Sequence, residues 1–488
     1  MKKALLLLLG LLMTGIPLFA GGNRQTGSAK ADEPVELVWY TGGLEPQTDM
    51  PVVLAEINKY LKEKINCTLK IIETDFGNFP QKMQMVIASQ EPFDICFTSN
   101  WCNDFASNVN KNAFLELETL LPQYAPDLYR LIPEAGWRAA SVNGHIYGIP
   151  NYQIWVRATA IVAETEWLTR YNMNIDQLKT WDGIETILSR IKKDNPNMYP
   201  FDEFVMVDVG SVLGVEELIS AALPGAIRFG DNSLKAINQY ELPQVMEIFK
   251  RLRSWNQKGY IRPDMAIIPN NYQDKLEGKA PIQIGGVMKP GYESEEAIKR
   301  GGREVKTAAF VDGMLTTNGI TATMQGISRS SKNPEKALQF LNLLNTDKYL
   351  YNLLIWGIEG KHYRKAGTNF VEPIPNSGFG IACDWMYGNQ FLAYFKPGQN
   401  ETDWEETIKI NKAAKISPAI GFAFNPASVQ TEIATVSAVV TEYIRPLLCG
   451  AVDPEKTLPE FLGKLKDAGS EKLVAELQRQ LDAWKASK

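Results

Sequence analysis

Histidine is nearly absent from this 488-residue chain, and cysteine is rare. The two histidines, His145 and His362, are far apart in the sequence, which leaves little for a zinc site. The five cysteines match no metal-binding spacing; they are Cys67, Cys96, Cys102, Cys383 and Cys449. A bridge between Cys96 and Cys102 stays open, with buried free thiols as the default expectation. We therefore predict neither a metal site nor a cofactor.

Signatures of common enzyme classes are also missing. No Gly-x-Ser-x-Gly elbow occurs, no Gly-x-Gly-x-x-Gly fingerprint follows the first predicted strand, and Gly357-x-x-Gly360-Lys361 has the wrong spacing for a Walker loop. Glycoside hydrolysis would need two facing carboxylates, such as Glu45 and Asp75. Among 56 acidic residues some such pair always exists, so it is weak evidence. We predict that the protein is not an enzyme, with a secreted glycan-cleaving enzyme as the alternative.

Long runs of one kind of residue are few. The net charge is −5 at pH 7 and no long basic run occurs, so nucleic acid is not expected as a partner. Beyond the first 20 residues no apolar run reaches 18 residues, the length typical of a membrane span. The mature protein is therefore expected to be soluble.

The longest apolar run, residues 4–12, has the features of an export signal. Two lysines precede it, and small residues near Ala20 follow it. We predict a signal peptide over residues 1–20 and a flexible tether over the polar residues 21–33. The protein should be exported to the periplasm or the cell surface. No cysteine near Ala20 offers a lipid attachment site, although an uncleaved signal would tether the protein.

Strands and helices alternate after the predicted tether. Apolar spacing predicts helices at 50–65 and 80–90, between strands at 35–40, 68–73 and 93–98. This β-α-β-α-β order implies a parallel sheet covered by helices. Further along, Asn143-Gly144 predicts the type I′ turn of a hairpin within residues 140–150.

A second α/β pattern occupies the middle of the chain. Apolar stripes predict helices near 181–191 and 245–255 and a strand at 280–286, and residues 319–328 are expected to form a strand that crosses back. Asn333 and Asp453 each precede proline and glutamate, which is typical of a helix N-terminus. From residue 426 onward the pattern is mostly helical.

The fold class that follows is α/β, with two discontinuous lobes and a helical C-terminal region. Lobe 1 is predicted to comprise residues 34–152 and 318–375. Lobe 2 is predicted to comprise residues 153–317 and 376–488, including the C-terminal helices. The chain would then cross between the lobes at least twice.

Several segments carry a recognisable pattern. Three of them are "NGHIYGIPNY" (143–152), "KGYIRPD" (258–264) and "GISRSSKNPEKALQFLNLL" (326–344). They resemble segments of the extracellular solute-binding proteins of bacterial ABC importers that take up sugars and oligosaccharides. The segments "WGIEGKHY" (356–363), "WMYGNQF" (385–391) and the helical end from Arg445 are similar to the solute-binding lipoprotein branch, which has a C-terminal extension of unassigned role. The resemblance spans nearly the whole mature chain. It implies a periplasmic-binding-protein-like (type II) fold whose two lobes close on a ligand.

Aromatic and amide side chains cluster where the predicted strands end. Trp101 lies between Asn100 and Asn103, directly after the third strand. An aromatic ring can cover the apolar face of a sugar, and amide side chains can form hydrogen bonds with its hydroxyl groups. Burying one hydroxyl group without a hydrogen-bond partner costs about 1–3 kcal/mol of free energy. Ligands of open α/β sheets bind beyond the carboxyl ends of the strands. The candidate ligand-binding residues are Tyr40, Glu45, Phe76, Asn100, Trp101, Asn103, Asn151, Tyr152, Gln153, Gly286, Trp385 and Asn389.

Structural roles stay open for several of these candidates. Trp101 would equally suit a rim position packed on its own lobe, residues 151–153 would suit hinge packing, and Gly286 would suit a simple turn. We predict the extracytoplasmic substrate-binding component of an ABC transporter. It would bind a carbohydrate, with an oligosaccharide preferred, act as a monomer, and deliver its ligand to membrane permease subunits. A sensing or peptide-binding module with the same fold is a further alternative.

Overall fold

A computed structural model describes residues 33–43, 47–204, 209–268, 270–381 and 383–487. The predicted signal peptide, the tether up to residue 32 and the candidate Glu45 lie outside the described residues. None of the helices in the described ranges combines the length and apolar character needed to cross a bilayer. Residues 34–488 contain two large hydrophobic cores, each built around its own sheet.

The first core surrounds a five-stranded sheet with the strand order β2-β1-β3-β13-β6. β1 runs parallel to β2 and β3, whereas β13 runs antiparallel to β3 and β6. The β-α-β-α-β order predicted for residues 35–98 is therefore confirmed. The strands are β1 (Val35–Gly43), β2 (Cys67–Asp75), β3 (Ile95–Thr98), β6 (Gly148–Pro150) and β13 (Met324–Ile327).

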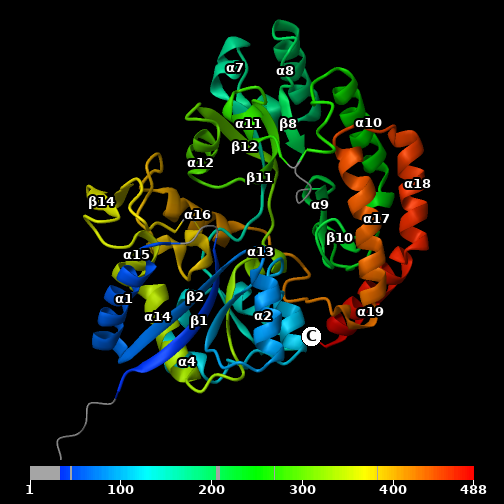
Figure 1. Ribbon diagram of the computed structural model, residues 1–488. Helices are drawn as coiled ribbons and strands as arrows, with labels where there is room; N and C mark the ends of the chain where they lie inside the picture. Colours follow the sequence, from blue (N-terminus) through cyan, green and yellow to red (C-terminus); the bar gives the residue numbers. More distant parts are fainter. Residues whose placement is uncertain (1–32, 44–46, 205–208, 269, 382, 488) are drawn as a thin grey trace, which may run out of the picture. The chain divides into compact units, whose positions relative to one another are not determined.

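Helices cover this sheet because each has one apolar face. In α1 the side chains of Val53, Ile57 and Leu61 recur at helical spacing and are buried, and Figure 1 shows α1 and α2 beside β1 and β2. The helices of this part are α1 (Met50–Ile65), α2 (Phe79–Ala88), α3 (Phe105–Asn110), α4 (Leu121–Tyr124), α5 (Pro126–Leu131), α6 (Glu134–Ala139), α13 (Thr317–Thr321), α14 (Pro334–Thr346) and α15 (Lys348–Trp356).

Two short hairpins accompany the first core. One joins β4 (Ser141–Val142) to β5 (His145–Ile146), and the other joins β14 (Tyr363–Ala366) to β15 (Phe370–Pro373). Asn143 and Gly144 have φ values of 53° and 89°. These two positive values are what a type I′ turn requires, so the predicted hairpin is confirmed.

The second core surrounds a four-stranded sheet with the order β12-β7-β11-β8. Its strands are β7 (Thr159–Glu164), β8 (Phe201–Phe204), β11 (Ile282–Val287) and β12 (Val305–Val311), with a separate hairpin of β9 (Val215–Glu217) and β10 (Ala226–Arg228). The helices are α7 (Thr165–Arg170), α8 (Trp181–Asp194), α9 (Val209–Val212), α10 (Pro243–Gln257), α11 (Tyr272–Leu276) and α12 (Tyr292–Lys299). The predicted helices at 181–191 and 245–255 and the strand at 280–286 are confirmed.

The C-terminal region adds helices to the second core. α16 (Asp403–Ala413) precedes α17 (Gln430–Leu448), α18 (Pro454–Asp467) and α19 (Ser470–Ala486). In Figure 1, α17 and α18 lie beside α10. Leu473, Leu477 and Leu481 of α19 recur at helical spacing and are fully buried in this core. The expected helical C-terminus therefore forms an integral layer of the second lobe.

Three connections join the two cores. Core membership changes after Val156 and before Leu315, and it alternates over residues 414–424, where Ile420 belongs to the first core and Ala419, Phe422 and Phe424 belong to the second. The connections pair with one another, because Leu315 forms an antiparallel bridge with Val156 and a parallel bridge with Ile416. The lobe boundaries predicted at 152 and 318 lie near the first two places.

The third lobe boundary differs from the expected position at residue 376. Phe379, Met386 and Ala393 are buried in the first core. This stretch therefore packs with lobe 1, whereas helices α17, α18 and α19 pack with lobe 2. The physical reason is the apolar content of this stretch, which fills space beside α14 and α15 rather than covering the second sheet.

Two local expectations also change. Residues 319–328 were expected to form one strand, but Thr317–Thr321 form α13 and only Met324–Ile327 form β13. Thr316 caps α13 by accepting a hydrogen bond from Gly319 N (3.0 Å).

Of the two other predicted helix starts, Asn333 lies at the N-cap of α14 without a capping side-chain hydrogen bond, whereas Asp453 caps α18 by accepting a hydrogen bond from Glu455 N (3.0 Å). All five cysteines are free and buried, so the Cys96–Cys102 bridge is not formed.

Candidate functional site

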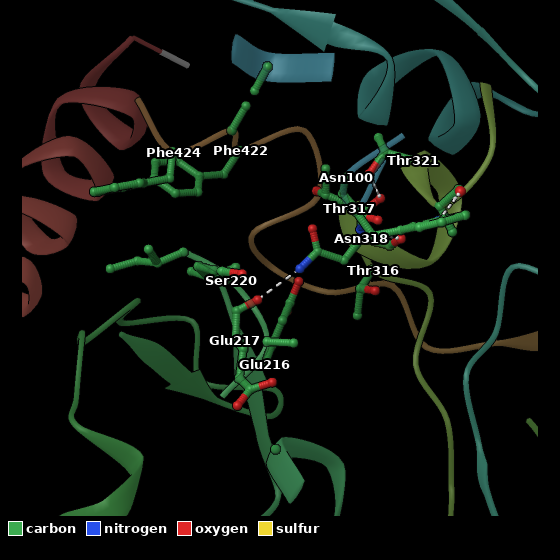
Figure 2. Close-up of a pocket in the computed structure, with 18 of the residues that line it drawn as sticks. Asn100, Glu216, Glu217, Ser220, Thr316, Thr317, Asn318, Thr321, Phe422 and Phe424 are labelled. Atoms are coloured by element: carbon green, nitrogen blue, oxygen red, sulfur yellow. Dashed lines mark hydrogen bonds between the residues drawn. The ribbon is translucent and has the colours of Figure 1, made fainter. Parts of the chain in front are cut away.

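A pocket of about 690 Å³ lies where residues of both cores converge. The loop after β3 and helix α13 form one wall, which we call the strand-end wall. The β9 region and the segment that leads into α17 form the other, which we call the composite wall. Figure 2 shows Asn100 and Thr321 on one side and Phe422 and Phe424 on the other. The polar residues that line the pocket include Asn100, Asp104, Arg157, Ser211, Glu216, Glu217, Ser220, Thr316, Thr317, Asn318 and Thr321.

The strand-end wall is held in place by hydrogen bonds between the β3 loop and α13. Asn100 Nδ2 donates to Asn318 O (2.9 Å), and Trp101 Nε1 donates to Ala322 O (2.8 Å). Ser99 Oγ accepts from the backbone nitrogens of residues 101 and 102 and so shapes the turn. These bonds fix the indole of Trp101 although its side chain is 53% exposed.

Trp101 belongs to an aromatic cluster with Phe76 and Trp385. The ring centroid of Phe76 lies 5.4 Å from that of Trp101 and 6.3 Å from that of Trp385, with the second pair nearly parallel at 10°. Trp101 and Trp385 are 6.4 Å apart. Gly42 of β1 admits the Phe76 ring, because a Cβ at this position would lie 2.6 Å from it. Three segments far apart in the sequence thus form one aromatic surface at the pocket edge.

Direct hydrogen bonds link the composite wall to the strand-end wall. Asn318 Nδ2 of α13 donates to Glu217 O of β9 (2.9 Å), as Figure 2 shows. Phe422 and Phe424 add two aromatic rings to this wall. The pocket therefore combines aromatic faces with short hydroxyl and amide side chains, a lining suited to a ligand with apolar faces and many hydroxyl groups.

Glu216 is the most deeply buried charged group of the pocket lining, with 5% of its side chain exposed. Its Oε2 atom accepts a hydrogen bond from Ser417 Oγ, whereas Oε1 is buried without a hydrogen-bond partner among the described residues. Burial raises the pKa of this carboxyl from 4.5 to about 7, and the Ser417 bond lowers it by less. Burial therefore favours the neutral form of this carboxyl group more than water does.

Five of the predicted site residues are buried and bonded to other protein groups. Asn103 Nδ2 donates to Phe97 O (2.8 Å), and Gln153 Nε2 donates to Thr323 Oγ1 (2.9 Å). Asn151 Oδ1 accepts from Gly388 N (3.0 Å), and Tyr152 pairs by its backbone with Asn389. Asn151, Tyr152 and Asn389 therefore hold the loop that carries Trp385 instead of lining the pocket.

Tyr40 and Gly286 also lie away from the pocket lining. The Tyr40 hydroxyl donates to Glu91 Oε1 (2.7 Å) inside the first core, and burial raises the pKa of the phenol to about 12. Gly286 lies in β11 with φ of 86°, where a Cβ would meet the Tyr292 hydroxyl at 2.0 Å. Its lack of a side chain accommodates that tyrosine. Of the predicted residues, Asn100 and Trp101 line the pocket, and Phe76 and Trp385 adjoin it.

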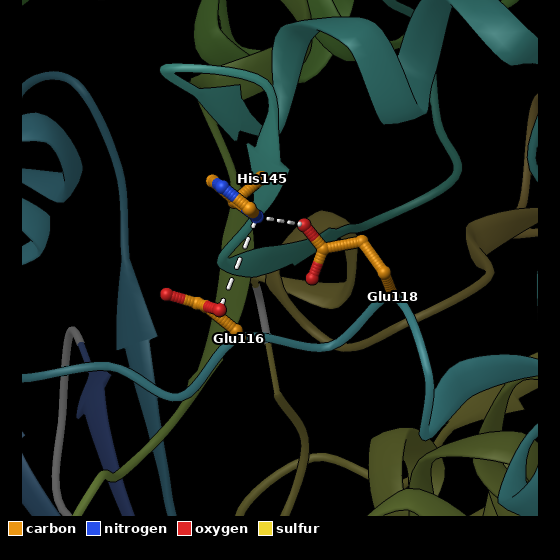
Figure 3. A group of neighbouring side chains, drawn as sticks. All are labelled: Glu116, Glu118 and His145. Carbon is orange, nitrogen blue, oxygen red and sulfur yellow. Dashed lines mark hydrogen bonds and ion pairs between the residues drawn. The ribbon is translucent and has the colours of Figure 1, made fainter.

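A separate surface cluster contains one of the two histidines. His145 Nδ1 lies 2.9 Å from Glu118 Oε1 and 3.9 Å from Glu116 Oε2 (Figure 3). One ligand atom from each residue lies within 4.8 Å of the others, which is close enough to hold a metal ion. Glu118 Oε1 also accepts from Ile146 N (2.9 Å), and Glu116 Oε1 accepts from Tyr147 Oη (3.0 Å). These bonds make the cluster a brace for the β4–β5 hairpin, and the sequence spacing did not reveal it.

Most of the composite wall was not predicted from the sequence. Glu216, Ser220, Phe422 and Phe424 follow no strand of either central sheet. The only available signal was weak, namely two phenylalanines in the short run "GFAF" (421–424) before the last helices.

Two proteins named for binding are similar to this chain over 96% and 74% of its length. A carbohydrate ABC transporter substrate-binding protein of Streptococcus pneumoniae serotype 4 is 27% identical over 475 residues, which are 96% of this chain and 94% of that protein. The polygalacturonan/rhamnogalacturonan-binding protein YtcQ of Bacillus subtilis is 22% identical over 389 residues, which are 74% of each protein. Both relatives are named for binding.

Solved structures agree with the observed fold. A crystal structure of the N-glycan transport solute binding protein (NgtS) of Streptococcus pneumoniae is 27% identical and gives a TM-score of 0.82, covering 92% of this chain and 98% of that one. The structure of NgtS in complex with Man5GlcNAc gives a TM-score of 0.71 and covers 93% of this chain. The complex with Man1GlcNAc gives a TM-score of 0.73 and covers 92% of this chain. Both comparisons cover 99% of the NgtS chain and have 27% sequence identity.

Family models match two parts of the chain. Residues 418–486 match a model described only as a domain of unknown function, DUF3502. Residues 44–351, more than half of the chain, match the model of bacterial extracellular solute-binding proteins. The chain, with its two α/β lobes and a pocket lined from both, belongs to the bacterial extracellular solute-binding protein family.

Proposed function

We propose that this protein is the extracytoplasmic substrate-binding component of an ABC importer and that it binds a carbohydrate in the pocket between its lobes. The observation that carries the proposal is the pocket itself, where Trp101 and Phe424 present aromatic rings among amide and hydroxyl groups. Such a lining pairs with both surfaces of a sugar, the apolar ring face and the hydroxyl rim. The relatives named for carbohydrate binding support the same function.

The ligand is an oligosaccharide of the kind carried by N-glycans. NgtS, which is similar over nearly its full length, has been crystallised with Man5GlcNAc and Man1GlcNAc. A pocket of about 690 Å³ has room for more than one sugar ring, and the aromatic cluster extends it along the first lobe. Trp101 and Asn100 contact the sugar directly, Phe76 and Trp385 extend the stacking surface, and Asn103, Asn151, Tyr152, Gln153 and Asn389 hold these residues in place.

Ligand binding closes the two lobes by a hinge motion at the three connections. The paired segments at Val156, Leu315 and Ile416 are the short stretches at which the chain changes core. The structure superposes better on the NgtS structure for which no glycan is named than on its two glycan complexes. That difference is expected if the lobes change their arrangement on binding. The closed monomer then presents its ligand to the permease subunits, and no chemistry occurs on the sugar.

A glycan screen tests this function. Thermal unfolding of the purified protein is followed with neutral and acidic oligosaccharides, including Man5GlcNAc, and the glycans are then analysed by chromatography. A ligand that binds only the folded state raises the melting temperature by an amount that grows with concentration. Intact glycan after incubation supports transport, whereas turnover would establish the secreted glycan-cleaving enzyme instead. No shift with any glycan would reject carbohydrate binding.

A further inference from the structure

We infer that the C-terminal region matched as a domain of unknown function is part of the ligand site: its first residues form a wall of the pocket, and α19 positions them. The inference rests on the proposed function, because it assigns a role within the same pocket. The match begins at residue 418, inside the third connection between the lobes. Phe422, Ala423, Phe424, Pro426 and Ile433 of this region line the pocket.

The segment 416–426 is held between both lobes. Ile416 bridges Leu315, and Ser417 Oγ donates to the buried carboxylate of Glu216. Thr317 Oγ1 of α13 donates to Ala419 O (3.3 Å) and accepts from Gly421 N (2.9 Å). The segment therefore contacts α13 on the strand-end wall and β9 on the composite wall.

Gly421 lets this segment approach the first lobe closely. Its φ of 88° lies in the left-handed region, and a Cβ there would lie 2.8 Å from Arg138 O at the end of α6. The chain then turns so that Phe422 and Phe424 face the pocket, as Figure 2 shows. Backbone geometry at a single glycine thus directs two aromatic side chains into the site.

The last helix clamps the far end of the segment. Gln480 of α19 donates from Nε2 to Asn425 O (2.8 Å) and accepts at Oε1 from Asn425 N (2.8 Å). The Trp484 ring meets the Phe422 ring edge to face, with centroids 5.7 Å apart. Because Asn425 follows Phe424 directly, this clamp sets the position of the pocket-lining rings. Gln480 is a positioning residue that acts on the ligand through Phe422 and Phe424.

The same helix provides a matched control. Gln478 makes an equivalent clamp, accepting from Ala236 N (2.8 Å) and donating to Leu234 O (3.3 Å). Each glutamine also donates to an acidic side chain of α19, Gln480 to Glu476 and Gln478 to Asp482. Neither Leu234 nor Ala236 lines the pocket. Gln478→Ala therefore removes the same kind of contact from the same helix without touching the site.

The experiment measures Man5GlcNAc affinity by calorimetry and the melting temperature of the full chain. Gln480→Ala is expected to weaken binding about five-fold, the equivalent of one net hydrogen bond. Gln478→Ala should lower the melting temperature by a similar amount and leave the affinity unchanged. Phe424→Ala should weaken binding about ten-fold or more, through loss of an aromatic contact. Phe424→Leu keeps the core filled, so that affinity is still measured if Phe424→Ala unfolds.

A double variant separates positioning from general stability. In the Phe424→Leu background, Gln480→Ala should cost less than about two-fold in affinity, because contacts that act as a unit are not additive. Normal binding by Gln480→Ala, or equal losses in both glutamine variants, would overturn the inference while leaving carbohydrate binding intact. A wild-type protein that binds no glycan of the panel would reject the proposed function, and this inference with it.

Discussion

The two walls of the pocket are built in different ways. In the strand-end wall, the loop that carries Asn100 and Trp101 directly follows β3, a strand of a central sheet. The composite wall brings together Glu216 and Phe424, which are separated by more than 200 residues in the sequence. The first wall therefore comes from a general rule about α/β sheets, and the second from contacts specific to this fold.

The walls also differ in electrostatics. The strand-end wall presents amide and indole groups with exposed surface, whereas the composite wall contains the buried carboxyl of Glu216. Burial of a carboxyl group favours its neutral form. The composite wall should therefore respond to pH through Glu216, whereas the loss of Trp101 from the strand-end wall should act mainly through contact area.

The largest expected effect is the pH dependence contributed by Glu216. Its folded-state pKa of about 7 lies above its usual 4.5, so the folded protein holds this proton more tightly than the unfolded chain does. The free energy of unfolding should therefore fall as pH rises from about 5 to 8, by up to about 3 kcal/mol. Glu216→Gln should remove this part of the slope, as measured by urea unfolding at pH 5, 6, 7 and 8. Identical slopes for the two proteins would show that Glu216 ionises normally.

Trp101→Ala should have the next largest effect, on glycan affinity. The indole is half exposed and fixed by a hydrogen bond to Ala322 O, so it is ready to stack on a ligand. We expect a loss of about 2 kcal/mol in binding, or about thirty-fold in Kd, with little change in melting temperature. Tyr349→Ala is the matched control, because Tyr349 is 54% exposed and lies outside the pocket lining. Equal affinities for wild type and Trp101→Ala would place the ligand elsewhere.

Trp385→Ala should weaken binding less than Trp101→Ala. Trp385 stacks on Phe76 but does not line the pocket, so it supports the far end of the aromatic surface. We expect a loss of about 1 kcal/mol for a long glycan such as Man5GlcNAc. Calorimetry with Man1GlcNAc is the comparison, because a shorter glycan should lose less. An equal loss for both lengths would mean that Trp385 acts through Trp101.

The smallest expected effect concerns ligand charge. Among the described lining residues, Asp104, Glu216 and Glu217 carry carboxyl groups, and Arg157 carries the only positive charge. An acidic oligosaccharide such as trigalacturonate should therefore bind less tightly than a neutral one. Asp104→Asn keeps the N-cap of α3 and should improve the relative affinity for trigalacturonate by about two-fold, with the gain reduced in high salt. Tighter binding of the acidic glycan to wild type would contradict this.

Much of the fold was predictable because it rests on local patterns. The first three strands and two helices lie close to the positions that apolar spacing predicted. The spacing of apolar residues over a short stretch is enough to indicate which face of a helix or strand will be buried. The strand predicted at 319–328 failed over its first half, because Thr316 caps a helix there. The boundary at 376 failed because apolar composition does not say which of two cores a segment will fill.

The candidate site was predictable only in part. Asn100 and Trp101, which were predicted because they directly follow a sheet strand, line the pocket. The same amide–aromatic pattern at 151–153 led instead to buried residues, whose side chains bond to the loops around Trp385 and Thr323. Residue type alone does not distinguish an amide that binds a ligand from one that holds a loop.

The sequence by itself determines that this chain is an α/β protein resembling solute-binding proteins, with aromatic and amide groups in the loops where strands end. Periodicity and short motifs suffice for this because they act over neighbouring residues. Only the tertiary structure decided that β9, the third connection and α19 complete the pocket. That outcome depends on how two separately built cores bring distant segments together, and no local pattern encodes it.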